Sequence, residues 1–180
     1  YNKAYQLKKA GVNLKFMAGN HDYWVLEFMK EKIMNSTYFD DTTFSTKGKN
    51  FYITHGDGIL SWDHGYRLLK KIIRSPFFIK CFRFLHPTLG YSIARKVSRT
   101  AEHYEIPKDI HEKIKNELIN HASSHFKKGF DYMVCGHYHL NEIIDVGKGK
   151  LVILGDWEDQ PSYAMFNGKE LTLHQWDDNA

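Results

Sequence analysis

The chain has 180 residues, of which 42% are hydrophobic and 26% charged, as is ordinary for a globular protein. This length suits a single domain, and no run approaches the ~20 apolar residues that a membrane-spanning helix needs. Two distant cysteines, Cys81 and Cys135, exclude a disulfide framework and fit a reducing compartment. Cys135 lies in an apolar run and is expected to be a small buried hydrophobe.

The net charge of +4 conceals a strong asymmetry. From His64 to Ala101 the chain has nine Lys or Arg residues and no Asp or Glu. All 21 acidic residues and the other 16 basic ones lie outside this segment, which therefore carries +9 against −5 for the rest. A partner of the segment is expected to be anionic.

In chain order, the first third of the sequence alternates between helical and extended patterns. Residues 2–10 are typical of the end of a surface helix, which Gly11 terminates. Residues 24–34 carry apolar side chains at helical spacing. Three short segments have the composition of strands, namely 14–18, an edge strand at 42–45 and a central strand at 51–54.

The middle of the chain is predicted to be helical. Helices are expected over 63–73, from Ser75-Pro76 with proline in the first turn, and over 88–99. Pro107 then opens a long amphipathic helix whose apolar stripe is Ile110, Ile114, Leu118 and Ala122. We interpret 64–106 as a helical lid inserted into one domain that spans 1–180.

The last third of the chain is predicted to be extended. Strands are expected at 131–135, 143–146, 151–154, 162–166 and 170–175, and Asn167-Gly168 is a strong hairpin signal between the last two. Together with the helices, these strands indicate the α/β class.

Three of the predicted strands run directly into glycine with His, Asn or Asp. The segments are Gly19-Asn20-His21-Asp22, His55-Gly56-Asp57 and Gly136-His137-Tyr138-His139. Because ligands of open α/β sheets bind outside the carboxyl ends of the strands, these side chains are expected around one crevice. Imidazole nitrogen and amide or carboxylate oxygen suit Mn, Fe or Zn rather than Ca. Any single histidine is more often a surface or core residue, but the joint pattern favours a metal site.

These motifs resemble the last three of five signature blocks of the calcineurin-like metallophosphoesterases, in the same order and at strand ends. The resemblance covers essentially the whole chain and implies a four-layer αββα sandwich. It also implies two divalent metal ions, for which Mn²⁺ is the first choice and Fe and Zn are the alternatives. By the resemblance, Asn20, His55 and His137 would bind one ion and His139 the other. His21 would act at the leaving or attacking oxygen, oriented by Asp22. For Asp57, a carboxylate that holds the loop after His55 is the preferred interpretation.

The first two blocks of the family, Asp-x-His and Gly-Asp-x-x-Asp, have no counterpart before Gly19. In the family they supply the remaining ligands and the carboxylate that bridges both metals. We therefore expect the chain to be N-terminally truncated, to lack the first strands of the sandwich and to be inactive alone. With the full site, two-metal hydrolysis at phosphorus is implied.

The basic, apolar lid directs the choice of substrate. Basic amphipathic helices favour anionic membrane surfaces, and an apolar lid can hold acyl chains; a helical cap packed on the body is the plainer alternative. Lid and block order are similar to the UDP-2,3-diacylglucosamine hydrolases of lipid A biosynthesis, which cleave a pyrophosphate to UMP and a lipid monophosphate at the inner face of the bacterial cytoplasmic membrane. By this similarity Asn20, His21, Asp63 and Tyr66 would contact substrate, and the location would be cytoplasmic and peripheral on that membrane. Asp63 as a helix N-cap and Tyr66 as lid packing are the alternatives.

Three interpretations of function remain open at this point. The first is hydrolysis of a lipid-linked nucleotide, with no nucleic acid and no obligate protein partner. The second is a general nucleotide or phosphodiester phosphodiesterase of the same fold. The third is a non-catalytic membrane-associated scaffold with a degenerate site. Well-known members of the hydrolase family have Arg at the position of His21, which leaves the exact substrate open.

Overall fold

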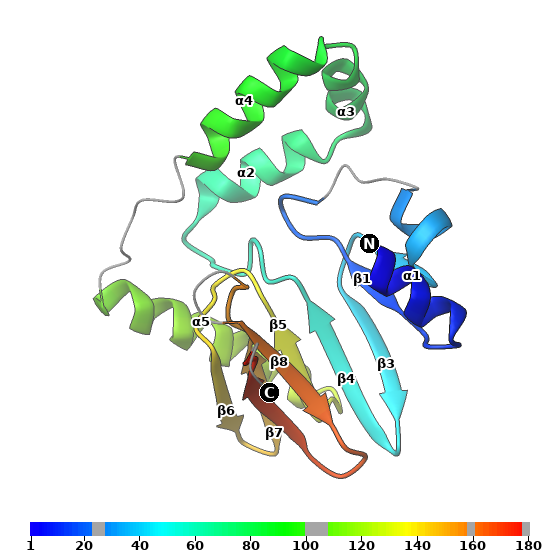
Figure 1. Ribbon diagram of the computed structural model, residues 1–180. Helices are drawn as coiled ribbons and strands as arrows, with labels where there is room; N and C mark the ends of the chain where they lie inside the picture. Colours follow the sequence, from blue (N-terminus) through cyan, green and yellow to red (C-terminus); the bar gives the residue numbers. More distant parts are fainter. Residues whose placement is uncertain (23–27, 100–107, 158–160, 178–180) are drawn as a thin grey trace. The chain divides into compact units, whose positions relative to one another are not determined.

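The computed structural model describes residues 1–22, 28–99, 108–157 and 161–177, and it confirms the α/β class (Figure 1). The chain divides into two compact units, which we call unit 1 (Tyr1–Ile59 with Leu118–Ala180) and unit 2 (Leu60–Glu117). The start of the predicted helix at 24–34 and the end of the predicted lid at 100–106 lie outside the described residues.

A five-stranded sheet forms the centre of unit 1. Its order is β3 (Thr42–Thr46), β4 (Lys49–Thr54), β5 (Tyr132–Cys135), β7 (Gly149–Ile153) and β6 (Glu142–Val146). The three inner strands β4, β5 and β7 are parallel, whereas both outer strands are antiparallel to their neighbours. The predicted strands are thus confirmed, and the carboxyl ends of three parallel strands meet at one edge.

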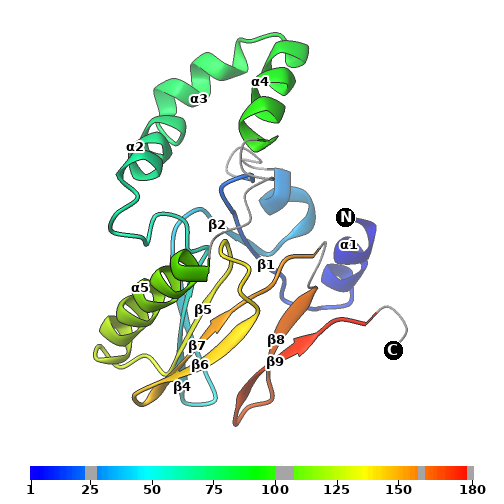
Figure 2. The same cartoon turned by 90° about the vertical axis from the view of Figure 1, so that its left-hand side faces the viewer.

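Alternating side chains of this sheet pack against two different layers. On one face the ring of Phe51 lies 5.1 Å from that of Phe166, in the hairpin of β8 (Ser162–Phe166) and β9 (Leu171–Gln175). On the other face Tyr52 stacks at 3.7 Å on His125 of α5 (Lys108–Phe126). Figure 2 shows the C-terminal part of α5 and the hairpin on opposite sides of the sheet. Helix, sheet and second β-layer are compatible with an α/β sandwich; the calcineurin-like arrangement stays a prediction.

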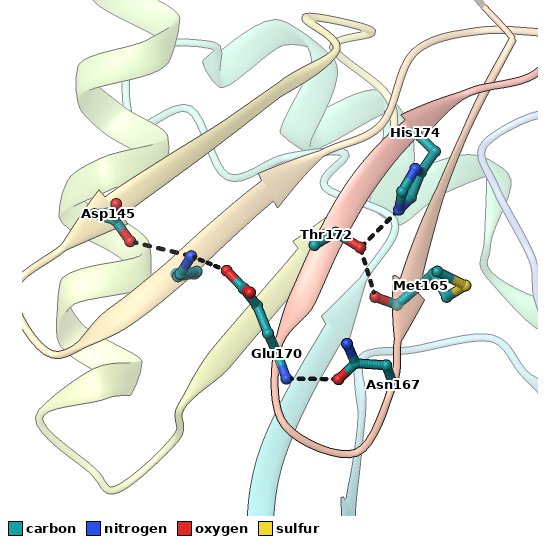
Figure 3. A network of polar contacts seen from close by, with 7 residues as sticks. Asp145, Met165, Asn167, Glu170, Thr172 and His174 are labelled. Carbon is teal, nitrogen blue, oxygen red and sulfur yellow. Dashed lines mark hydrogen bonds and ion pairs between the residues drawn. The ribbon is translucent and has the colours of Figure 1, made fainter.

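Polar contacts join the hairpin to the sheet (Figure 3). Lys150 Nζ lies 3.8 Å from Asp145 Oδ1 and 3.3 Å from Glu170 Oε1. Asn167 Oδ1 accepts hydrogen bonds from the backbone N–H groups of Lys169 and Glu170, at 2.9 and 3.0 Å. Gly168 has φ +93°, which favours glycine. The predicted Asn-Gly turn is therefore confirmed.

The first 38 residues build a small parallel sheet of their own. The helix α1 (Asn2–Lys9) is followed by Gly11, whose N–H donates to Lys8 O, while the Val12 N–H donates to Leu7 O, both at 3.0 Å. Among the described residues, the strand β1 (Lys15–Met17) pairs only with β2 (Ser36–Tyr38). It is therefore not part of the central sheet. Sequence reasoning missed β2.

The helix predicted over 24–34 is present in its described part, but as a π-helical turn rather than a regular α-helix. Met29–Ile33 forms a π-helical turn, η1, which the Met34 N–H closes by donating to Met29 O at 2.8 Å. Met29 and Ile33 are both buried. Because an i→i+5 turn presents nearly the same apolar spacing as an i→i+4 turn, the hydrophobic pattern does not distinguish them.

Unit 2 consists of capped, largely solvent-exposed helices. Its helices α2 (His64–Ile73), α3 (Pro76–Arg83) and α4 (Pro87–Arg99) match the predicted spans, and α5 begins there. Asp63 Oδ1 accepts from the Tyr66 N–H at 3.0 Å, and Ser75 Oγ from the Phe78 N–H at 3.2 Å. Both side chains satisfy helix N-termini. In the part of the chain that the structure describes, no helix is long and apolar enough to span a membrane.

Candidate functional site

Two of the predicted motifs meet at the carboxyl ends of β4 and β5. The Gly136 N–H donates to His55 O at 3.1 Å, and Tyr138 OH donates to Gly56 O at 3.0 Å. The imidazole rings of His55 and His137 lie 5.1 Å apart, edge to face. Parallel pairing of the two strands, with Thr54 beside Cys135, is what brings these loops together. These two motifs therefore lie side by side, and the crevice expected around them stays a prediction.

The first motif also reaches His55, although β1 is not part of the central sheet. Asn20 Oδ1 lies 3.0 Å from His55 Nε2. Gly19 is buried against the same ring, since a Cβ there would lie 2.9 Å from His55 Cε1. Asp22 Oδ2 accepts from the Gly19 N–H at 3.4 Å, so its carboxylate holds the turn that carries Asn20. His55 is therefore the residue on which all three motifs converge.

The loop after β5 has an unusual backbone. His137, His139 and Asn141 adopt left-handed φ values of +65°, +51° and +51°. Non-glycine residues in this region cost on the order of 1–3 kcal/mol each and persist where the surrounding structure enforces them. Such strain is frequent at binding and catalytic sites, and here it affects both histidines of the motif.

The donor atoms of this site suit a divalent transition-metal ion. Two ligands at about 2.1 Å and a right angle around a metal are separated by roughly 3 Å, and Asn20 Oδ1 and His55 Nε2 are 3.0 Å apart. The same distance is an ordinary hydrogen bond when no ion is present. Among the described residues, no three His, Cys, Asp or Glu side chains lie close enough together to hold a metal ion. The structure thus supplies a pair of fitting donors rather than a complete cage.

Asp156 is a member of this region that sequence reasoning missed. Its Oδ2 lies 4.0 Å from His139 Nδ1. Asp156 follows β7 in the segment Leu154-Gly155-Asp156, so an apolar strand again runs into glycine and a polar residue. The same sequence signal that marked the other three strand ends could have found it.

The remaining predicted residues lie on the turn beside Asn20, in unit 2 and in the loop after His55. His21 is exposed on the turn next to Asn20. Asp63 and Tyr66 belong to unit 2, where Asp63 fulfils the alternative N-cap role and Tyr66 is half-buried. Asp57 is 7% exposed, which fits a carboxylate within the loop after His55. Contact of His21, Asp63 and Tyr66 with substrate stays a prediction.

Buried and paired groups elsewhere in unit 1 make poorer candidates. Burial raises the pKa of the Cys135 thiol to about 12, which keeps it protonated and confirms its role as a buried hydrophobe. A cavity of about 170 Å³ includes Lys49, Asp131 and Lys150 in its lining, at the opposite ends of the strands. Two of its lysines already pair with carboxylates, Lys49 with Asp131 at 2.8 Å and Lys150 with Glu170 at 3.3 Å.

The chain is similar to bacterial hydrolases over almost its entire length. Proteins named UDP-2,3-diacylglucosamine hydrolase from Porphyromonas gingivalis, Pectobacterium carotovorum and Xanthomonas oryzae are 28%, 23% and 25% identical to it. The alignments cover 98%, 94% and 93% of this chain and 73%, 72% and 72% of those proteins. No family model matches the chain. The similarity to these hydrolases that the three motifs and the helical segment predicted is thereby confirmed.

Proposed function

We propose that this protein is a metal-dependent phosphohydrolase that cleaves a lipid-linked pyrophosphate, UDP-2,3-diacylglucosamine, to UMP and the lipid monophosphate. The observation that carries the proposal is the convergence of Asn20, His55 and His137 at one sheet edge. The relatives named above support the substrate, because their names state it and the similarity covers both the strand ends and the helical segment.

The proposed cofactor is a pair of divalent cations, Mn²⁺ or alternatively Fe or Zn. Asn20, His55 and His137 would hold one ion and His139 the other. When bound, such ions lower the pKa of a water molecule and stabilise negative charge on phosphoryl oxygens. Asn20 contributes an oxygen without adding charge, so the site keeps its attraction for an anionic substrate.

His21 is the proposed proton donor to the leaving group. Its side chain is exposed on the turn beside Asn20, where a substrate can reach it. An imidazole next to the reacting phosphate can donate a proton or stabilise the developing charge. Asp22 supports this role indirectly, because its carboxylate holds the Gly19–Asp22 turn.

The proposed partner of unit 2 is an anionic membrane surface. Several large apolar side chains of α2 and α3 are exposed, namely Leu68 62%, Ile72 47% and Phe77 79%, as is Phe84, the C-cap of α3, at 81%. The same helices carry the exposed basic residues Arg67, Lys71, Lys80 and Arg83. Apolar and cationic side chains on short amphipathic helices favour the interface of an anionic bilayer, where the substrate's acyl chains reside.

Turnover of the lipid nucleotide tests the proposed function. The protein is expressed from its complete coding sequence, and UMP release from UDP-2,3-diacylglucosamine is measured with and without Mn²⁺. His55→Ala and Asn20→Ala should each lower kcat/KM by at least about 100-fold, since each removes a donor at the centre of the site. Circular dichroism and thermal unfolding verify that the variants are folded.

Two results would replace the proposal. Hydrolysis of a simple phosphodiester such as bis(p-nitrophenyl) phosphate, without any UMP release from the lipid nucleotide, would favour the general phosphodiesterase. Absence of both activities, with vesicle binding retained, would favour the scaffold. Unchanged UMP release in His55→Ala would exclude the proposed site.

A further inference from the structure

A third strand of the central sheet, β7, ends beside the candidate site. The strand β7 runs parallel to β5, with Cys135 next to Ile153. The ladder continues past both strands, because the Leu154 N–H donates to Cys135 O at 2.8 Å. Asp156 therefore emerges next to the loop that carries His137 and His139. Its Oδ2 lies 4.0 Å from His139 Nδ1.

A hydrogen bond to β8 holds the segment that carries Asp156 in place. The Gly155 N–H donates to Ser162 Oγ at 2.8 Å, and Ser162 is a buried residue at the start of β8. The side chain of Asp156 is 27% exposed, whereas that of His139 is 52% exposed. The carboxylate is thus the better-held partner, and the imidazole is the group with more freedom to be oriented.

We propose that Asp156 is a positioning residue for His139. Its carboxylate accepts the Nδ1 proton of His139 and so fixes the neutral tautomer in which Nε2 carries the free lone pair. Metal-binding histidines commonly donate their second ring N–H to a carboxylate, which sets the ring orientation and raises the basicity of the ligating nitrogen. A separation of 4.0 Å exceeds a direct hydrogen bond, and one bridging water or a small rotation of the exposed ring closes it.

The left-handed backbone of His139 supports this role. With φ +51°, His139 adopts a left-handed backbone conformation that is uncommon for a residue with a β-carbon. This backbone sets the direction in which the His139 side chain projects from the loop. The orienting part of the proposal concerns the metal-free protein. Its consequence for metal affinity rests on the proposed function.

The tautomer of His139 tests the orienting role directly. Two-bond ¹H–¹⁵N spectra of the metal-free protein distinguish Nδ1–H from Nε2–H imidazole. We expect His139 to be mainly Nδ1–H in the wild type and to shift toward Nε2–H in Asp156→Asn, with Asp156→Glu restoring the wild-type signal in part. The control is Asp145→Asn, because Asp145 is an exposed carboxylate near Lys150 at the other end of the sheet. An unchanged His139 tautomer in Asp156→Asn would overturn the proposal.

Metal affinity tests the consequence. Calorimetric titration with Mn²⁺ should give about 10- to 100-fold weaker binding for Asp156→Asn. Asp156→Asn should have little further effect in a His139→Ala background, because Asp156 acts through that ring. Additive losses would show that Asp156 binds the ion itself and would overturn the positioning role. Unchanged Mn²⁺ binding in His139→Ala would contradict the proposed metal site, and the tautomer measurement would then still decide the orienting role.

Discussion

His55 is surrounded by glycines from two other segments of unit 1. A Cβ at Gly19 would lie 2.9 Å from His55 Cε1, closer than real side-chain contacts allow. A Cβ at Gly136 would have its nearest neighbour, His55 O, at 3.7 Å, an ordinary contact. Neither glycine has a left-handed φ, so substitution by alanine tests space rather than backbone strain. The same substitution at these two glycines, both of which neighbour His55, therefore compares a position without space for a methyl group with one that has it.

We expect Gly19→Ala to displace the His55 ring and to weaken Mn²⁺ binding by roughly tenfold, as changes next to a metal ligand do. Gly136→Ala should have a much smaller effect, because its added methyl group fits. Calorimetric titration of both variants with Mn²⁺, together with their thermal midpoints, checks this. Equal affinities for the two variants would show that the ring of His55 moves freely and that Gly19 does not constrain it.

At the scale of elements, the contact of α5 with β4 includes two buried imidazole nitrogens. His125 stacks on Tyr52, and the rings of His121 and His125 lie 4.8 Å apart. Within the described residues, His121 Nε2 and His125 Nδ1 are buried without a hydrogen-bond partner. Burial lowers the pKa of both histidines. Asp41 partly opposes this effect, whereas Lys128 adds to it.

The free energy of unfolding should therefore decrease as the pH falls below about 6.5, the pKa of an unfolded histidine. The folded pKa values are lowered, so the unfolded chain binds more protons and stability rises with pH in the window below 6.5. Urea unfolding between pH 5 and 8 measures the effect. His125→Phe retains a ring on Tyr52 but removes one titrating group, and its loss of stability at low pH should be shallower. An identical pH profile in this variant would assign the dependence to other groups.

A second element-scale contact holds the hairpin onto the sheet. Phe44 and Phe51 are cross-strand neighbours in β3 and β4, and their rings stack at 4.7 Å. They differ in burial: Phe51 is 2% exposed and packs against the hairpin, whereas Phe44 is 36% exposed. The same substitution at both positions thus compares a core ring with a surface ring.

Phe51→Ala should lower the free energy of unfolding by about 3–5 kcal/mol, since it leaves a cavity between the sheet and β8–β9. Phe44→Ala should cost about 1–2 kcal/mol, because solvent already reaches that ring. Urea denaturation followed by circular dichroism gives both values. Similar losses would mean that the hairpin does not depend on Phe51 for its packing.

At the scale of the whole molecule, the separation of charge distinguishes the two units. Eight of the nine basic residues of the 64–101 segment lie in the helices α2, α3 and α4 of unit 2, and the ninth, Arg74, is the C-cap of α2. Exposed apolar side chains accompany them on α2 and α3. An anionic surface that also accepts apolar groups satisfies both properties at once.

Reversal of charge on α2 tests this partner. Replacement of Lys70, Lys71 and Arg74 by Glu should reduce sedimentation with vesicles rich in anionic lipid by roughly tenfold or more, because each basic residue near the surface contributes about 1 kcal/mol. The matched control replaces three lysines of unit 1, Lys3, Lys30 and Lys32, and should sediment like the wild type. Equal sedimentation of both triple variants would leave packing of the helices as the explanation of their composition.

Local pattern was sufficient to predict most elements and to group the candidate site residues. Helix caps such as Asp63 and Ser75, the alternation of Phe51 and Tyr52, and the Asn167-Gly168 turn depend on neighbours in sequence. The recurrence of glycine with His or Asn after an apolar strand also lies in the sequence, which is why Asn20, His55 and His137 could be grouped before any geometry was known.

Long-range pairing determined the rest. The sequence by itself specified which strands end in polar residues, but only the order β4-β5-β7 placed Asp156 beside His139. Likewise, only the tertiary structure separated β1 from the central sheet and replaced the predicted helix end with a π turn. Local propensity is encoded within a few residues, whereas strand order and the buried neighbours of a side chain depend on contacts between distant segments, such as that of Phe51 with Phe166.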